Sequence, residues 1–108
     1  MTQINFSYPE AAKPWLDVLP TEVITSLPTT SNIAQFIDGQ NLSCPMPLLK
    51  TKVALRTLAD GDMLYVIATD PNSQADITAF CHQSQLSLQQ ASTDSHGLNV
   101  YHFFITKA

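Results

Sequence analysis

The segment Ser43–Lys50 (SCPMPLLK) holds the residues best suited to chemistry, because one cysteine stands directly before two prolines at alternate positions. A helical pattern follows at once, and proline favours the first turn of a helix, where its missing N–H needs no partner. We therefore expect Cys44 at or beside the N-cap of a helix. First-turn N–H groups and the helix dipole stabilise negative charge there. The pKa of the thiol should then fall below its free value of about 8.5.

Cys44 is accordingly the candidate catalytic residue, a solitary nucleophile tuned by backbone groups. Pro45 and Pro47 are expected to stiffen the turn and keep the thiol at the surface. Lys50 and Lys52 add positive charge nearby and are candidate partner-binding residues, although the sequence leaves open which of them points toward the sulfur. The alternatives without a functional role are that Cys44 is a small buried residue in a capped turn, and that the two lysines lie on the solvated face of a helix.

The second cysteine, Cys81, fits a different role. It shares one predicted helix face with Ile77 and Phe80, which favours an inert core thiol. The spacing of the two cysteines matches no CxxC metal or redox motif. The three histidines show no ligand spacing with either cysteine, so we expect no metal site.

Composition limits the classes of function. The chain has 108 residues, 44% of them apolar, and a net charge of −4 from nine acids and five bases. This suggests one globular domain and counts against direct binding to nucleic acid, which requires a basic patch. No apolar run approaches the roughly 20 residues of a membrane span. The first residues lack the pattern of a secretory signal, so we expect a cytoplasmic protein without a membrane partner.

The regular pattern of the chain begins at residue 34. Strands are predicted at 34–38, 63–68, 87–93 and 98–106, and helices at 45–59 and from Asp70 into the 80s. A turn at 94–97 should join the last two strands into a hairpin. The order β-α-β-α-β-β predicts an α/β (α+β) two-layer sandwich, with a mixed four-stranded sheet and both helices on one face.

Alternation in two strands predicts which side chains face the helices. Leu64 and Val66 should face them, whereas Tyr65 and Ile67 should point away. The fourth strand repeats the pattern, so the outer face of the sheet would be apolar, which a soluble monomer does not leave bare. Residues 1–33 form an N-terminal arm with several prolines and apolar residues, and we expect it to pack on this face. A homodimer and a loose extension are the rival explanations.

Over residues 34–108 the chain resembles the TusA/SirA-like sulfur-carrier (sulfurtransferase) family. The residues that carry the resemblance are Ile37, Asp38, Leu42, Cys44-Pro45-Met46-Pro47 (the CPxP motif), Lys52, Gly61, Leu64, Val66, Asp70, Pro71, Asp76, Ile77, Phe80, Cys81 and Ile105-Thr106-Lys107.

The resemblance implies a small bacterial protein that carries sulfur as a persulfide on Cys44. It implies a cysteine desulfurase as donor and a downstream acceptor protein, in a relay that ends in tRNA thiolation or related sulfur trafficking. No cofactor is needed on the carrier, because the pyridoxal enzyme upstream breaks the carbon–sulfur bond. Whether such a relay component counts as an enzyme stays open, as does the choice between a monomer and a weak homodimer.

The chain departs from the family pattern at three places. Asn41 stands where the family often has glycine, but asparagine tolerates the left-handed conformation, so the turn should survive. Gln85-Leu86 stand where the family often has Gly-His, which puts partner contacts by that loop in doubt. Residues 1–33 have no counterpart in the minimal family domain.

Two other functions stay open on the sequence. The chain could be a non-catalytic regulatory or interaction module that has kept the fold and uses its apolar sheet face or its arm. A thiol oxidoreductase is a weaker option, because Cys44 has no nearby resolving cysteine in the sequence. Loading of sulfur onto Cys44 distinguishes the carrier from both.

Overall fold

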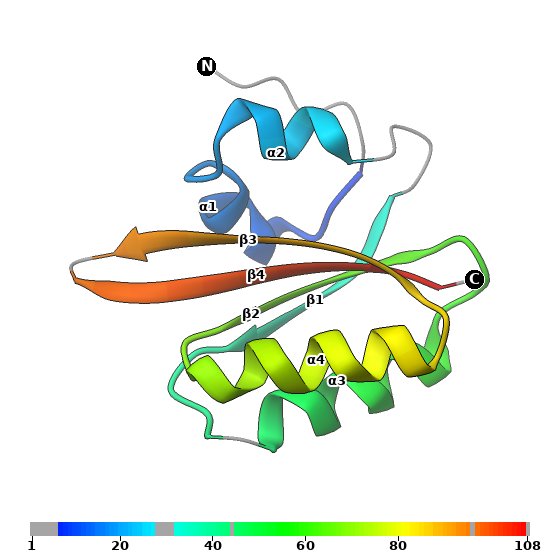
Figure 1. Ribbon diagram of the computed structural model, residues 1–108. Helices are drawn as coiled ribbons and strands as arrows, with labels where there is room; N and C mark the ends of the chain where they lie inside the picture. The colour runs from blue at the N-terminus through cyan, green and yellow to red at the C-terminus, as the bar shows by residue number, and fades with distance from the viewer. Residues whose placement is uncertain (1–6, 28–31, 44, 96, 108) are drawn as a thin grey trace.

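The computed structural model describes residues 7–27, 32–43, 45–95 and 97–107 of the chain, so Cys44 and His96 lie outside the described residues. The elements in chain order are η1 (Glu10–Ala12), α1 (Lys13–Leu16), α2 (Thr21–Ser26), β1 (Ile33–Gly39), α3 (Met46–Thr57), β2 (Met63–Ala68), α4 (Pro71–Gln83), β3 (Ser87–Ser95) and β4 (Leu98–Thr106) (Figure 1). The predicted order of strands and long helices is confirmed. The described residues before β1 add three short helical segments to it.

The four strands form one mixed sheet in the order β1-β2-β4-β3. Strands β1 and β2 are parallel, with Ile37 opposite Val66, and the other two pairs are antiparallel. The parallel pair requires a crossover, which α3 supplies. The tight turn of the β3–β4 hairpin includes Gly97, whose φ of 82° favours glycine.

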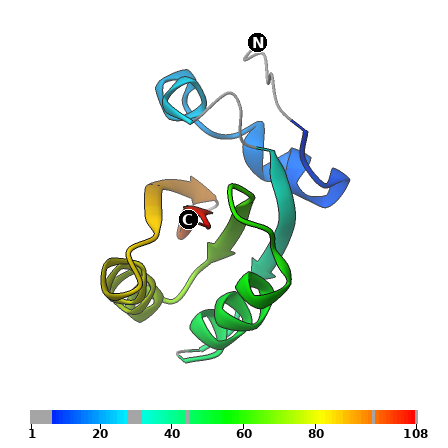
Figure 2. The ribbon, with the colours of Figure 1, turned by 90° about the vertical axis from the view of Figure 1, so that its right-hand side faces the viewer.

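Helices α3 and α4 lie side by side on one face of the sheet (Figure 2). Leu64 and Val66 of β2 face them, as the alternation predicted. The helix-side core consists of Ile37, Ala54, Leu55, Leu58, Leu64, Val66, Ala68, Ile77, Cys81, Phe103 and Ile105. The two helices and the sheet therefore share one apolar layer.

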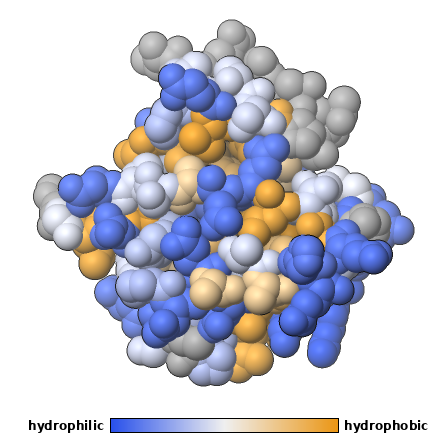
Figure 3. All heavy atoms as spheres, viewed as in Figure 1, coloured by the Kyte–Doolittle hydropathy of each residue, from blue (hydrophilic) through white to orange (hydrophobic). Residues whose placement is uncertain are grey.

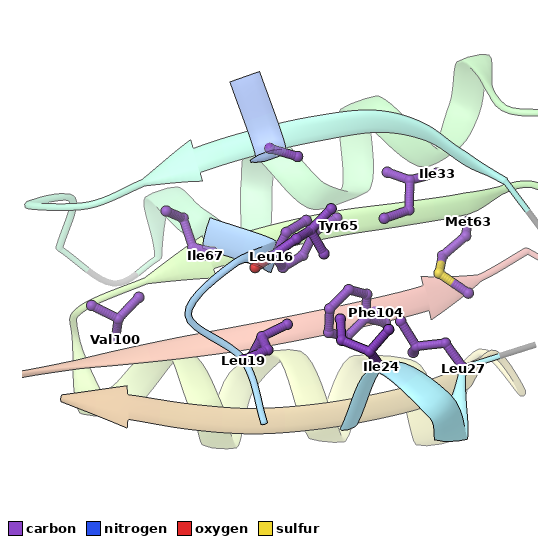
Figure 4. Close-up of a cluster of buried hydrophobic side chains, with 11 residues drawn as sticks. Leu16, Leu19, Ile24, Leu27, Ile33, Met63, Tyr65, Ile67, Val100 and Phe104 are labelled. Atoms are coloured by element: carbon purple, nitrogen blue, oxygen red, sulfur yellow. The ribbon is translucent and has the colours of Figure 1, made fainter. Parts of the chain in front are cut away.

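The opposite face of the sheet is covered by residues 7–27, which we call the arm (Figure 1). The arm-side core consists of Ala12, Leu16, Leu19, Ile24, Leu27, Ile33, Met63, Tyr65, Ile67, Val100 and Phe104 (Figure 4). Tyr8 and Trp15 pack against its margin. The outer face is apolar, as the sequence predicted, and the described part of the chain itself buries it.

Hydrogen bonds hold the arm at both edges of the sheet. At the β1 edge the Ile33 N–H donates to Ser7 O at 2.8 Å. At the β3 edge Gln89 Nε2 donates to Ser26 O at 3.0 Å. The arm thus crosses the whole width of the sheet. Hydrophilic residues cover much of the surface in Figure 3, and hydrophobic residues reach it in patches, including the junction of arm and sheet.

The boundaries differ from the prediction in small ways. Helix α3 ends at Thr57, and strand β3 continues to Ser95 instead of stopping at residue 93. The extension of β3 follows from its pairing with β4 along the full length of both strands. No helix among the described ranges has the length and apolar character needed to cross a membrane.

Candidate functional site

The predicted nucleophile, Cys44, lies outside the described residues, but both of its neighbours in the sequence are described. Pro45 is the N-cap of α3, and Met46 is the first helical residue. The Met46 N–H donates to Ser43 O at 2.9 Å, and the Leu49 N–H donates to Pro45 O at 3.0 Å. Cys44 therefore directly precedes the N-cap in the sequence, at the end where the helix dipole is positive.

The helix start corrects one detail of the prediction. Pro45 is the cap and not the first helical residue, since its φ of −99° and ψ of 17° are not helical. Pro47 occupies the second helical position, where a missing N–H costs nothing. Its carbonyl accepts a hydrogen bond of 2.8 Å from the buried Thr51 hydroxyl. No side chain caps the helix among the described residues, so its first-turn N–H groups keep their positive character.

A hydrogen bond joins the loop that precedes Cys44 to the loop that follows β2. Asn41 adopts a φ of 63°, which confirms that asparagine can replace glycine at this turn. Its N–H donates to Thr69 Oγ1 at 3.0 Å. Gly39 makes a close approach, since a Cβ on it would lie 2.6 Å from Ile67 O. The site loop consequently rests on the carboxyl ends of the parallel strands β1 and β2.

The two candidate lysines diverge in the structure. Lys50 lines a groove between α3 and β1. The Lys52 ammonium instead lies 5.3 Å from the centre of the Phe80 ring, on the side of α3 that faces α4. Two residues apart on a helix are about 200° apart around its axis, so they do not share a face. Of the two, only Lys50 borders the same groove as the first turn of α3.

This groove is the part of the site that the sequence did not predict. It has a volume of about 610 Å³ and lies between β1 and α3. Met46, Leu49 and Val53 line it with exposed fractions of 44%, 45% and 60%. These three side chains form an apolar stripe along the exposed surface of α3. The groove begins at Met46, two residues after Cys44, and is suited to contact a partner protein.

Cys81 occupies the position predicted for it. It is buried in the helix-side core, and burial raises the pKa of its thiol to about 11. It is therefore protonated at neutral pH and closed to solvent. Asp70 is the N-cap of α4, and its carboxylate accepts from the Asn72 N–H at 2.9 Å. Within the described ranges no three His, Cys, Asp or Glu side chains gather to hold a metal ion.

Residues 35–107 match the family model described as Sulfurtransferase TusA. The sulfur carrier protein TusA of Allochromatium vinosum is 36% identical over 74 residues, which is 68% of this chain and 93% of the relative. A putative sulfur carrier protein of Neisseria meningitidis is 41% identical over 59 residues, 55% of this chain and 80% of the relative. Both similarities leave about a third or more of this chain outside the match.

Among solved structures, the crystal structure of the SirA-like protein from Desulfitobacterium hafniense resembles this fold with a TM-score of 0.55. The two chains are 16% identical, and the match covers 68% of this chain and 99% of the other. At this identity the likeness concerns the fold alone. The predicted two-layer sandwich therefore has a counterpart among solved structures.

Proposed function

Because this chain belongs to the TusA sulfurtransferase family, we propose that it is a sulfur carrier whose Cys44 holds the transferred sulfur as a persulfide. The sulfur comes from a cysteine desulfurase-type donor and passes to an acceptor protein, in tRNA thiolation or a related pathway. Residues 34–108 form the carrier domain, and residues 1–33, which include the arm, are an N-terminal addition to it. The carrier works in the cytoplasm.

The transfer balances without an added oxidant or reductant. The Cys44 thiolate attacks the outer sulfur of the donor persulfide, forming one S–S bond while the donor S–S bond breaks. The electron pair leaves with the donor cysteine as a thiolate. An acceptor thiolate then repeats the exchange on the outer sulfur held by Cys44. No step requires a metal or an organic cofactor on this chain.

The observation that carries the proposal is the family match across a C-P-x-P motif that introduces a helix. Pro45 caps α3, and the helix supplies first-turn N–H groups that favour a thiolate. Pro45 and Pro47 stiffen this junction. The groove with Lys50 and the stripe of Met46 and Leu49 offers a surface on which the partner can dock at the first turn of α3.

The proposal is tested by incubating the full chain with a cysteine desulfurase and radiolabelled cysteine, followed by intact mass measurement. The wild type should gain one sulfur atom. Cys44→Ser should gain none, because the nucleophile is gone. Cys81→Ser is the matched control: it should load like the wild type, since the Cys81 thiol is buried and protonated.

The opposite result is equally clear. A wild-type chain that takes up no label from several desulfurases, while it remains folded, would contradict the carrier function and favour a non-catalytic interaction module. Label on Cys44→Ser would show that another group accepts the sulfur.

A further inference from the structure

A second hollow lies on the other side of α3, between α3 and α4. We call it the basic hollow. It has a volume of about 440 Å³ and is lined by Lys52, Leu55, Arg56, Phe80, Leu86 and Lys107. Lys52 lies six residues after the first residue of α3, about 9 Å along the helix axis. The hollow is thus on the same helix as the proposed loading point but faces away from the groove.

The basic hollow holds more than half of the basic residues of the chain. The whole sequence has five bases against nine acids, and three of the five bases line the hollow. None of its six lining residues is acidic. In the described part of the chain neither Lys52 nor Arg56 forms an ion pair. The hollow is therefore a local cationic surface on an acidic protein, which attracts anionic groups.

Two of the three cations are held in place by the fold. Lys107 Nζ donates to the carbonyls of Leu55 and Leu58, at 2.8 and 2.6 Å, and so closes the end of α3. The Lys52 ammonium is held over the Phe80 ring. Arg56 is exposed one turn beyond Lys52, and its planar guanidinium can bind a carboxylate through two parallel hydrogen bonds. Lys107 therefore has little side-chain freedom left to lose when an anion binds.

The floor of the hollow is apolar. Leu55, Leu86 and the Phe80 ring lie among the three cations. A free phosphate or sulfate would leave this floor uncovered, whereas a peptide that alternates carboxylates with apolar side chains would match both features. A nucleic acid is a poorer fit, because three cations on a chain of net charge −4 give little backbone attraction.

We infer that the basic hollow docks an acidic segment of a protein partner, one that carries an apolar or aromatic side chain between its carboxylates. The carboxylates pair with Arg56 and Lys52, and the apolar side chain covers Leu55, Leu86 and Phe80. That the partner belongs to the sulfur relay rests on the proposed function. The docking chemistry itself does not, because it involves neither Cys44 nor sulfur.

The test uses the full chain labelled with ¹⁵N and a short synthetic peptide that alternates glutamate with leucine. Amide signals of the basic hollow should shift on titration, and binding should weaken as salt is raised. Lys52→Gln and Arg56→Gln should each weaken binding about threefold, and the double variant roughly tenfold. Lys13→Gln is the matched control, since it removes one charge from the opposite side of the sheet, where Lys13 pairs with Asp17.

Several results would overturn the inference. These are no binding at millimolar peptide, shifts confined to the groove or the arm, equal binding of a peptide with lysine in place of glutamate, or an equal effect of Lys13→Gln. Tighter binding of a single-stranded RNA oligonucleotide would reassign the hollow to nucleic acid. Circular dichroism of each variant excludes unfolding as the cause. The desulfurase assay on Cys44 tests the proposed function separately, so either idea can fail alone.

Discussion

The Tyr65 hydroxyl and the His102 ring form a hydrogen bond of 2.5 Å between Oη and Nδ1, and neither side chain reaches solvent. On the other side of the ring, Thr93 Oγ1 lies 2.8 Å from Nε2. Both ring nitrogens are thus satisfied beneath the arm. Burial lowers the pKa of His102 to about 4 and raises the pKa of Tyr65 well above its ordinary range. The pair is held neutral in the folded protein.

Acid should therefore destabilise the fold. The unfolded chain protonates His102 near pH 6.5, whereas the folded chain keeps it neutral down to about pH 4. Between these values the unfolded state binds more protons, so the free energy of unfolding falls as pH falls through this window. The loss approaches about 3 kcal/mol at its lower end. Urea titrations at pH 7 and pH 5 should show about 2 kcal/mol of this loss.

The control for this effect is another histidine. His102→Asn should be less stable at pH 7 but should flatten the pH slope, because the titrating group is gone. His82→Gln changes an exposed residue of α4 and should keep the wild-type slope. If His102→Asn keeps that slope too, other groups cause the acid sensitivity.

Replacing Gly39 should disturb the loop that precedes Cys44. In Gly39→Ala the new Cβ would lie 2.6 Å from Ile67 O, a backbone atom that cannot turn aside. We expect a loss of about 2–3 kcal/mol in urea unfolding and slower sulfur loading. In Gly97→Ala the new Cβ meets open space, so only the conformational strain of about 1 kcal/mol remains. Equal losses and unchanged loading would contradict the close approach.

The residue after the C-cap of α4, Gln85, is a position where glycine should increase the stability of the fold. Gln85 has a φ of 57°, and the Leu86 N–H donates to Cys81 O at 2.9 Å, which is the arrangement that favours glycine after a helix. Gln85→Gly should raise stability by about 1 kcal/mol. Ser84→Gly, one residue earlier with a φ of −92°, should give no gain. Thermal melts of the two variants decide between them.

Shortening a buried side chain of the arm should lower the stability of the fold as much as shortening a side chain in a hydrophobic core does. Leu16 is 1% exposed against the sheet, so Leu16→Ala should lower stability by about 2–5 kcal/mol. Val18 is 56% exposed, and Val18→Ala should change stability by less than about 0.5 kcal/mol. Urea unfolding checks both values. Similar small losses in both would show that the arm does not support the sheet in solution.

Local rules explain what the sequence predicted well. Strict alternation placed Leu64 and Val66 on one face of the sheet and Tyr65 and Ile67 on the other. Tolerance of a left-handed φ accounted for Asn41. These features depend on neighbours within a few residues, so the order of elements and the faces of the strands follow from the chain itself.

Features that join distant segments could not be predicted in this way. The Tyr65–His102 bond depends on the register between β2 and β4, and Gly39 is required by a carbonyl 28 residues later in the chain. Lys50 and Lys52 are different, since their opposite directions follow from helix geometry alone. The sequence could not predict which surface each lysine lines: Lys50 lines the groove, and Lys52 lines the basic hollow.

The strand order has a consequence for how the protein is made. Strand β4 fills the centre of the sheet beside β2, yet it is translated after every other strand. Synthesis must reach Thr106 before β2 gains its second neighbour and both cores can close. Folding of this kind waits for contacts between remote segments and is slow compared with helix formation. The cysteine motif and the segment of β1, α3 and β2 around it are therefore made before the strand that completes the sheet on the other side of β2.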